Sequence, residues 1–264
     1  MIEPIRSTAP PLVGRPVASQ RWSRLTFLHW RVGASLLAPL MPAGVRPDEH
    51  DGSSWVGLIA FYLDRATLLG SPRVPYIGAF TEVNVRLYGV DERGRRGVVF
   101  LSLEASRLAT VLAARAAFSI PYFWSRTSQR EHEGLIEYHS VRHVGAGESH
   151  IVARPGAPID TDSTARFLTA RWALFATRFG RTIYLPNEHE PWSLRAATLV
   201  SLDDTLLERA GIQGLSGRQP DSVLYSEGVT TRFGSSSTLR VSSTDPATAA
   251  GMTKTAPRGT RKSR

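Results

Sequence analysis

Apolar and polar positions alternate most clearly between residues 76 and 90, and this pattern predicts a β-strand. Successive side chains of a strand point to opposite faces, so Val83, Val85 and Leu87 share one face. The other face carries an acid, an amide, a guanidinium and a phenol, from Glu82, Asn84, Arg86 and Tyr88. This polar face fits either a solvated surface or the wall of a pocket.

Further apolar or alternating runs, bounded by turn residues, predict strands along the rest of the chain. These strands are expected at residues 55–63, 98–103, 135–142, 149–153, 181–185, 192–202 and 223–233. The charged segment Asp91–Gly97 contains two glycines and predicts a turn that joins strands 76–90 and 98–103 into a hairpin.

Apolar residues at spacings of three and four predict helices at residues 27–40, 106–118, 164–179 and 203–210. Asp162 or Ser163 is expected to cap the third of these helices, and Gly180 to end it. Mostly short strands, hairpin turns and a few helices together predict an antiparallel α+β domain.

Three segments are expected from the composition of the chain. Residues 1–19 predict an extended N-terminal arm, residues 20–234 a single domain, and residues 235–264 a disordered basic tail. The net charge of the 264-residue chain is +9, and residues 240–264 alone contribute +5, from six Lys or Arg against one Asp. The basic character is therefore concentrated in the tail, and no specific nucleic-acid partner is expected.

The absence of cysteine excludes disulfides, thiolate metal sites and cysteine nucleophiles, and favours the cytoplasm as the compartment. No apolar run reaches the roughly 18 residues of an ordinary transmembrane helix, so no membrane partner is expected.

The two lysines, Lys254 and Lys262, both lie in the tail. The folded body thus has no lysine ε-amine that could form a Schiff base with a carbonyl compound.

Familiar catalytic motifs, such as a nucleophile elbow, a Walker A loop or a zinc-protease helix, do not occur. His139 and His143 lie on a predicted strand, where four residues span about 13 Å, so one ion cannot bridge them. His189, between Glu188 and Glu190, would need metal ligands from elsewhere. We therefore expect no metal and no cofactor.

Five motifs occur in order along residues 20–234: Phe27-x-His29-Trp30, Thr81-Glu82-x-Asn84-Val85-Arg86-x-Tyr88, Phe100-Leu101-Ser102-Leu103-Glu104, Ala114-Arg115-x-x-Phe118-x-Ile120-Pro121-Tyr122, and His189-Glu190-Pro191-Trp192-x-Leu194. Together they resemble the YqjF-like uncharacterised family of bacterial proteins (domain of unknown function 2071). That family is similar in turn to the acetoacetate decarboxylase-like superfamily. The resemblance implies one domain with a curved, barrel-like, mainly antiparallel sheet around a central cavity.

The resemblance also suggests roles for individual residues. Glu82 matches the carboxylate that lines the decarboxylase site, and Arg115 matches an arginine of the same site. Tyr122 and Phe123 stand where those enzymes carry the Schiff-base lysine and the lysine that depresses its pKa. The resemblance therefore implies a pocket that keeps the acid and lacks the nucleophile.

The candidate catalytic residues are Glu82, as acid/base or hydrogen-bond partner, and Tyr122, as hydrogen-bond donor. Candidate substrate-binding residues are Asn84, Arg86, Arg115, His29 and His189. An internal salt bridge to Glu82 or Glu104 is the alternative role for each of the two arginines. Inside a pocket, Glu82 would have to be neutral, paired or hydrogen-bonded.

These residues predict a cytoplasmic protein that binds or transforms a small organic acid or carbonyl compound without Schiff-base chemistry. Association with further copies of the chain stays open. One alternative is a non-catalytic interaction module that uses its surface or its basic tail. Another is a metal-dependent hydrolase that uses His29, His139 or His189 with Glu190.

Overall fold

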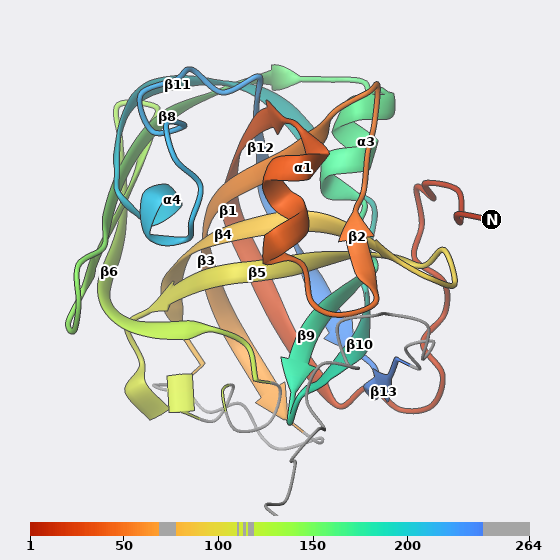
Figure 1. Cartoon of the computed structure of the whole chain (residues 1–264). Helices are drawn as coiled ribbons and strands as arrows, with labels where there is room; N and C mark the ends of the chain where they lie inside the picture. Colours follow the sequence, from red (N-terminus) through yellow and green to blue (C-terminus); the bar gives the residue numbers. More distant parts are fainter. Residues whose placement is uncertain (69–77, 110, 113–114, 116–118, 240–264) are drawn as a thin grey trace, which may run out of the picture.

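A computed structural model describes residues 1–68, 78–109, 111–112, 115 and 119–239 (Figure 1). In this part of the chain the strands are β1 (Ala18–Val32), β2 (Val45–Pro47), β3 (Ser54–Leu68), β4 (Phe80–Asp91), β5 (Arg96–Ala105), β6 (Tyr122–His132), β7 (Leu135–Arg142), β8 (Glu148–Pro158), β9 (Ala173–Arg178), β10 (Arg181–Glu188), β11 (Leu194–Asp204), β12 (Ser222–Phe233) and β13 (Ser237–Thr238). The helical segments with defined bounds are α1 (Ala34–Leu37), the 3-10 turn η1 (Ala38–Leu40), α3 (Ser163–Thr169) and α4 (Leu206–Arg209).

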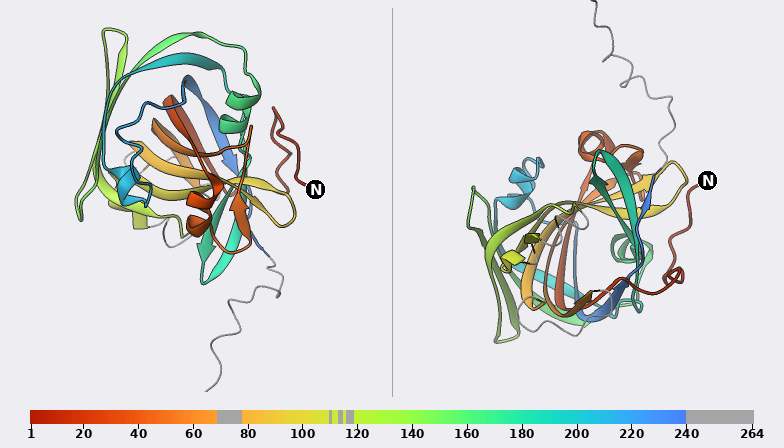
Figure 2. Two further views of the ribbon diagram at one scale, coloured as in Figure 1. Left: turned by 45° about the horizontal axis from the view of Figure 1, so that its top comes forward. Right: turned by 90° about the horizontal axis from the view of Figure 1, so that it is seen from below.

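The strands form one sheet that curves into a barrel. Its order is β13-β10-β9-β5-β6-β7-β8-β11-β12-β1-β3-β4-β2, with further pairings of β4 with β5 and of β10 with β12. Those extra pairings join strands that are distant in this order, and the strands form a ring when seen along the barrel (Figure 2, right). Neighbouring strands are antiparallel, except that β5 runs parallel to both β6 and β9. This arrangement confirms the expected curved, mainly antiparallel sheet.

The long strands β1, β3 and β4 separate two apolar clusters. Phe27, Ile59 and Phe61 belong to the cluster inside the barrel. Val83 and Val85 belong to the cluster on the outer face of the sheet, which helices α1 and α4 help to cover. Because both faces of β4 are buried, its polar face points into the barrel and not into solvent.

The helix expected at residues 27–40 is wrong, because residues 18–32 form strand β1. Strand β1 pairs along most of its length with β12 on one side and with β3 on the other. These partners lie far away in sequence. Hydrogen bonds to them stabilise the strand, whereas the apolar spacing of this short run favours a helix only weakly. The helical part is limited to α1 and the 3-10 turn η1.

The long helix expected at residues 164–179 is also wrong. Asp162 does cap a helix, since its side chain accepts a hydrogen bond from the Ala165 backbone N–H, but α3 ends at Thr169. The following residues form β9, which pairs with β10 and with β5. The apolar run from Leu174 to Ala176 is therefore buried as a strand.

Other expectations differ in extent. The hairpin of strands 76–90 and 98–103 is confirmed as β4 and β5, although residues 69–77 lie outside the described residues. The helix expected at 106–118 falls partly on residues that are not described, and its described residues 108–109, 111–112 and 115 are helical. Strand β6 was not expected from the sequence. The helix expected at 203–210 is only four residues long, as α4.

The N-terminal arm lies against the barrel. The Glu3 backbone N–H donates to the Gly94 carbonyl at 2.9 Å, and the Arg96 backbone N–H donates to the Glu3 carboxylate at 2.7 Å. Farther along the arm, the Trp172 indole N–H donates to the Arg6 carbonyl at 3.1 Å. The arm is thus held by specific contacts at Glu3 and at Arg6.

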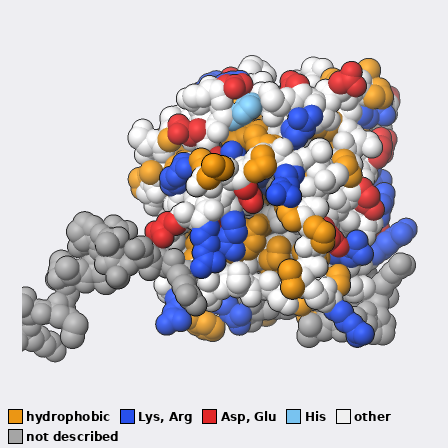
Figure 3. All heavy atoms as spheres, turned by 90° about the vertical axis from the view of Figure 1, so that its right-hand side faces the viewer, with side chains coloured by type: hydrophobic (Ala, Val, Ile, Leu, Met, Phe, Trp, Pro, Cys, Tyr) orange, Lys and Arg blue, Asp and Glu red, His pale blue; other side chains and the backbone are white. Residues whose placement is uncertain are grey.

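The charged surface concerns the alternative of an interaction module, which stays a prediction. Basic and acidic side chains are interspersed on the face drawn in Figure 3. The expected basic tail lies almost entirely outside the described residues, which end at Leu239. No helix in the described part of the chain is long and apolar enough to cross a membrane.

Candidate functional site

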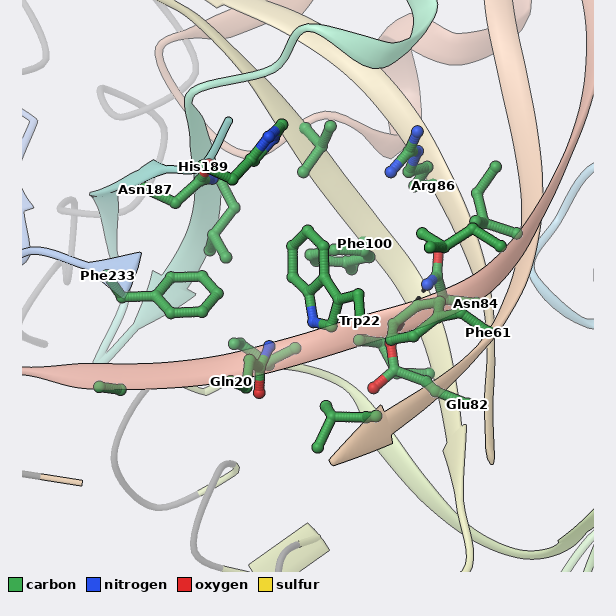
Figure 4. A pocket seen from close by; sticks show the side chains of 18 of the residues that line it. Gln20, Trp22, Phe61, Glu82, Asn84, Arg86, Phe100, Asn187, His189 and Phe233 are labelled. Carbon is green, nitrogen blue, oxygen red and sulfur yellow. Dashed lines mark hydrogen bonds between the residues drawn. The ribbon is translucent and has the colours of Figure 1, made fainter. Parts of the chain in front are cut away.

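A cavity of about 330 Å³ lies inside the barrel, between the inner faces of β1, β3, β4, β5 and β10. Most of its wall is apolar. Polar side chains reach it mainly from two sides, with Glu82, Asn84 and Arg86 on β4 and Asn187 and His189 at the end of β10 (Figure 4). A mainly apolar wall with a few polar groups is the usual character of a small-molecule site.

Glu82 is buried in this wall and hydrogen-bonded at both carboxylate oxygens. The Tyr122 hydroxyl donates to Oε2 at 2.8 Å, and Asn84 Nδ2 donates to Oε1 at 3.2 Å. Burial raises the pKa of Glu82 from 4.5 to about 7, against the two hydrogen bonds, which lower it. Burial and the neighbouring Glu82 raise the pKa of Tyr122 well above its usual range. The Glu82 carboxyl group can therefore take up or release a proton near neutral pH, while the phenol stays protonated.

Arg86 lies on the same face of β4, four residues after Glu82. Its Nε donates to the Tyr88 hydroxyl at 3.1 Å, and its Nη2 donates to the Leu168 carbonyl at 3.2 Å. Both acceptors are neutral, and within the described residues no carboxylate forms an ion pair with Arg86. Its positive charge is therefore available to an anion in the cavity.

Arg171 is a second guanidinium at the cavity wall, but it is already paired. Its Nη1 donates to Asp48 Oδ2 at 2.7 Å, and its Nε donates to the Phe167 carbonyl at 2.7 Å. The same Asp48 oxygen accepts a hydrogen bond from Arg96. Asp48 thus holds Arg171 in place at the cavity wall through an ion pair.

His189 reaches the cavity from the end of β10. Its Nδ1 lies 2.6 Å from the Glu190 carbonyl oxygen, which can only accept, so Nδ1 carries the proton. Burial lowers the pKa of His189 to about 4. The ring packs between Trp172 and Trp192, at centroid distances of 4.6 and 4.7 Å. His189 is thus a neutral imidazole whose Nε2 is a hydrogen-bond acceptor.

Two of the expected substrate-binding residues lie away from the cavity wall. His29 is completely buried behind it, with Nε2 2.7 Å from the Tyr88 hydroxyl. Burial and the charges of Arg86 and Arg171 lower the pKa of His29 well below its usual range. It therefore lies behind the wall, in contact with Tyr88, the residue that also binds Arg86, and with the ring of Phe27.

Arg115 is exposed, with its guanidinium 5.5 Å from the centre of the Phe123 ring. The structure thus corrects the expectation that it shares the pocket with Glu82. Arg115 presents its side chain to solvent and does not line the cavity.

Glu104 is held by an arginine other than the two weighed from the sequence. Arg142 Nη2 donates to its Oε1 at 2.7 Å, and the Ser125 hydroxyl donates to its Oε2 at 2.5 Å. The Arg142 guanidinium also lies 3.7 Å from the centre of the Phe123 ring. Phe123 is therefore an aromatic ring that packs against the guanidinium of a buried ion pair.

Sequence reasoning did not identify Arg171, Asn187 or the aromatic residue Trp22 as wall residues, although all three line the cavity. Asn187 could have been found, because it lies two residues before His189 on an extended segment and so shares its face. Arg171 could not, because it was assigned to a helix that the structure ends at Thr169.

The histidines weighed for a metal site are not brought together. His139 packs its ring against His150 at 5.7 Å, while His29 and His189 contact Tyr88 and two tryptophans. Among the described residues, no three His, Asp or Glu side chains form a group that could hold a metal ion.

Comparison with known proteins relates the chain to one family. The profile of the DUF2071 family, described as an uncharacterized conserved protein, matches residues 19–230. The chain is 32% identical over 200 residues to the Uncharacterized protein YqjF of Bacillus subtilis (strain 168). That similarity covers 74% of this chain and 82% of the relative.

Solved structures with the same fold include three with low sequence identity. Acetoacetate decarboxylase from Legionella pneumophila has a TM-score of 0.58 and 13% identity, over 88% of this chain and 92% of that one. An acetoacetate decarboxylase-like enzyme from Sphingomonas wittichii RW1 has a TM-score of 0.59 and 13% identity, over 86% and 95%. The enduracididine biosynthesis enzyme MppR, complexed with pyruvate, has a TM-score of 0.54 and 11% identity, over 86% and 92%.

At these identities the structural similarity establishes the fold alone. The profile match and the Bacillus relative establish the family. The chain belongs to the DUF2071 family of uncharacterized conserved proteins and has the acetoacetate decarboxylase-like fold.

Proposed function

We propose that the cavity binds a small organic acid or a related carbonyl compound and transfers a proton to or from it without forming an imine. One observation carries this proposal. Arg86, whose charge no acid neutralises within the described residues, and Glu82, a carboxyl group that titrates near neutral pH, face the same cavity from one strand.

The spacing on β4 suits a ligand that spans both groups. Four residues along a strand separate the Cα atoms of Glu82 and Arg86 by about 13 Å, and both side chains line the same cavity. A carboxylate bound by Arg86 would direct the rest of the ligand toward Glu82. Asn84, between the two, offers an amide to the middle of the ligand.

Glu82 is suited to transfer a proton at a carbon next to a carbonyl group. As a carboxylate it would accept the proton, and the electron pair of the broken C–H bond would delocalise onto the carbonyl oxygen as an enolate. The reverse step would return the proton to carbon. Tyr122 would hold the carboxylate in place through its hydrogen bond.

Covalent amine catalysis is not part of this proposal, because the chain has no lysine before Lys254. The ligand class is supported by a fold relative, MppR, whose structure is a complex with pyruvate, an oxo acid. The catalytic role of Glu82 and Tyr122 and the binding role of Arg86 are therefore proposed independently of the decarboxylase reaction.

The test of this proposal is binding and proton exchange with 2-oxo acids, from pyruvate to phenylpyruvate. We expect the acids to raise the melting temperature, and their neutral methyl esters to do so less. Arg86→Met should abolish this difference, whereas Arg126→Met, at an exposed arginine, should keep it. Equal shifts by acids and esters would refute the role of Arg86.

Exchange of the protons next to the carbonyl group with D2O, followed by NMR, tests Glu82 separately. Glu82→Gln should slow the protein-catalysed exchange at least a hundredfold, in the range of general acid–base catalysis. Glu92→Gln, at an exposed acid of the β4–β5 turn, is the matched control. If wild type and Glu82→Gln exchange at the same rate, Glu82 is not the base.

A further inference from the structure

We infer that the ligand of this cavity is a carboxylic acid that carries an aromatic ring. This inference rests on the proposed function for the position of the carboxylate. It adds the chemical class of the rest of the molecule, which follows from the size of the cavity and the character of its walls.

The cavity is too large for a short hydrophilic acid. Its volume is about 330 Å³, and one water molecule takes up roughly 30 Å³ in the liquid. An acid of six non-hydrogen atoms would leave much of the space empty or filled with water against apolar walls, which is unfavourable. A ligand of roughly ten to twelve non-hydrogen atoms fits the space better at this volume per atom.

The walls are aromatic on several sides. Several separate segments supply rings to the cavity, among them Trp22, Phe61, Phe80, Phe100, Trp192 and Phe233. Trp22 is central among them, with its ring 5.6 Å from Phe61 and 6.2 Å from Phe233 in tilted and edge-on arrangements. A ligand ring placed among these side chains would gain face and edge contacts that an alkyl chain cannot make.

Charge and apolar surface are separated within the cavity. Figure 4 shows Trp22 and Phe100 between Glu82, Asn84 and Arg86 on one side and Asn187 and His189 on the other. The far side offers an amide, from Asn187, and an imidazole, from His189, whose Nδ1 donates to a backbone carbonyl. With its carboxylate at Arg86, a ligand would therefore extend its uncharged part into the aromatic region.

Isothermal titration with matched acids tests the inference. The probes are 3-phenylpropanoate, 3-cyclohexylpropanoate of equal heavy-atom number, and propanoate, with 3-phenylpropanol as the neutral analogue. We expect 3-phenylpropanoate to bind about two- to tenfold more tightly than the cyclohexyl acid, from ring–ring contacts. Propanoate should bind at least a hundredfold more weakly, because each buried CH2 contributes about fourfold.

Variants connect this preference to the walls. Phe233→Leu and Phe61→Leu should each reduce the advantage of the phenyl acid over the cyclohexyl acid. Phe179→Leu should not, because Phe179 is 89% exposed and lies outside the cavity wall. Phe233 is only partly buried, so its variant is expected to fold even if Phe61→Leu does not.

The outcomes separate this inference from the proposed function. Equal affinity for phenylpropanoate and propanoate, or tighter binding of the cyclohexyl acid, would overturn the aryl-acid inference even if Arg86→Met still weakened the binding of acids. An aryl preference that is the same for acid and alcohol, and insensitive to Arg86→Met, would instead overturn the proposed role of Arg86.

Discussion

The hydroxyl group of Tyr122 lies 2.8 Å from Oε2 of Glu82 and joins the start of β6 to the start of β4. The two residues are 40 positions apart in sequence. The hydrogen bond lowers the pKa of Glu82, while burial raises it more strongly, and the balance leaves that pKa at about 7. The protonation state of Glu82 therefore changes with pH near neutrality, and its pKa depends on the residues around it.

Glu82→Gln should stabilise the protein at alkaline pH. The pKa of Glu82 is about 7 in the folded protein and near 4.5 when exposed, so the folded state holds the proton more tightly. The contribution of Glu82 to stability is thus complete below pH 4.5 and declines as the pH rises to about 7. Above that, the buried charge destabilises by at most about 3 kcal/mol, which the neutral glutamine avoids.

Urea denaturation at pH 5 and pH 8 measures this effect. We expect Glu82→Gln to unfold at higher urea than wild type at pH 8, with a much smaller difference at pH 5. The exposed-site variant Glu92→Gln should show no such dependence on pH. A Glu82→Gln difference that is the same at both pH values would contradict the raised pKa.

Tyr122→Phe should raise the pKa of Glu82 further above 7, because it removes a hydrogen bond that favours the charged carboxylate. The decline of stability with rising pH should then extend to a higher pH than in wild type. The measurement is the free energy of unfolding between pH 4 and pH 9. Tyr122→Phe in the Glu82→Gln background serves as the control and should not shift with pH in this way.

Arg142→Met should destabilise the protein by about 3–5 kcal/mol, because it leaves the fully buried Glu104 carboxylate without its cation. The double variant Arg142→Met with Glu104→Gln should recover much of this loss. Thermal or urea denaturation measures the stability of the single and the double variant. Equal stability of the single and double variants would show that Glu104 does not need the guanidinium.

Gly57→Ala should disturb the support of Arg86. A methyl group at Gly57 would lie 3.2 Å from His29 Cδ2 and from the Tyr88 hydroxyl, and 3.3 Å from Arg86 Cγ. These contacts are tight, so the side chains must shift, and we expect a loss of about 1–2 kcal/mol in stability. Binding of acids should weaken several-fold, because the guanidinium is displaced.

The matched control for Gly57→Ala is Gly217→Ala, where an added methyl group meets nothing within 4 Å. Urea denaturation and titration with 3-phenylpropanoate measure stability and binding for both variants. Unchanged binding in Gly57→Ala would mean that Arg86 keeps its position without the close packing at residue 57.

Local chemistry in the sequence was sufficient to indicate the central part of the candidate site. The alternation on β4 places Glu82, Asn84 and Arg86 on one face, because a strand repeats every two residues whatever its partners are. The absence of lysine before the tail excluded imine chemistry without any structure. The end of β10 could likewise be recognised from its polar residues around His189.

Other features depended on partners that are distant in sequence. The apolar run at residues 27–32 fits a helix or a strand, and only pairing with β3 and β12 selects the strand. Because α3 ends at Thr169, Arg171 lies beyond the helix and reaches the cavity. Arg115, on a different segment, is exposed. The two-residue alternation along a strand predicts which side chains share a face. Closure of the barrel determines which of the two faces lies inside.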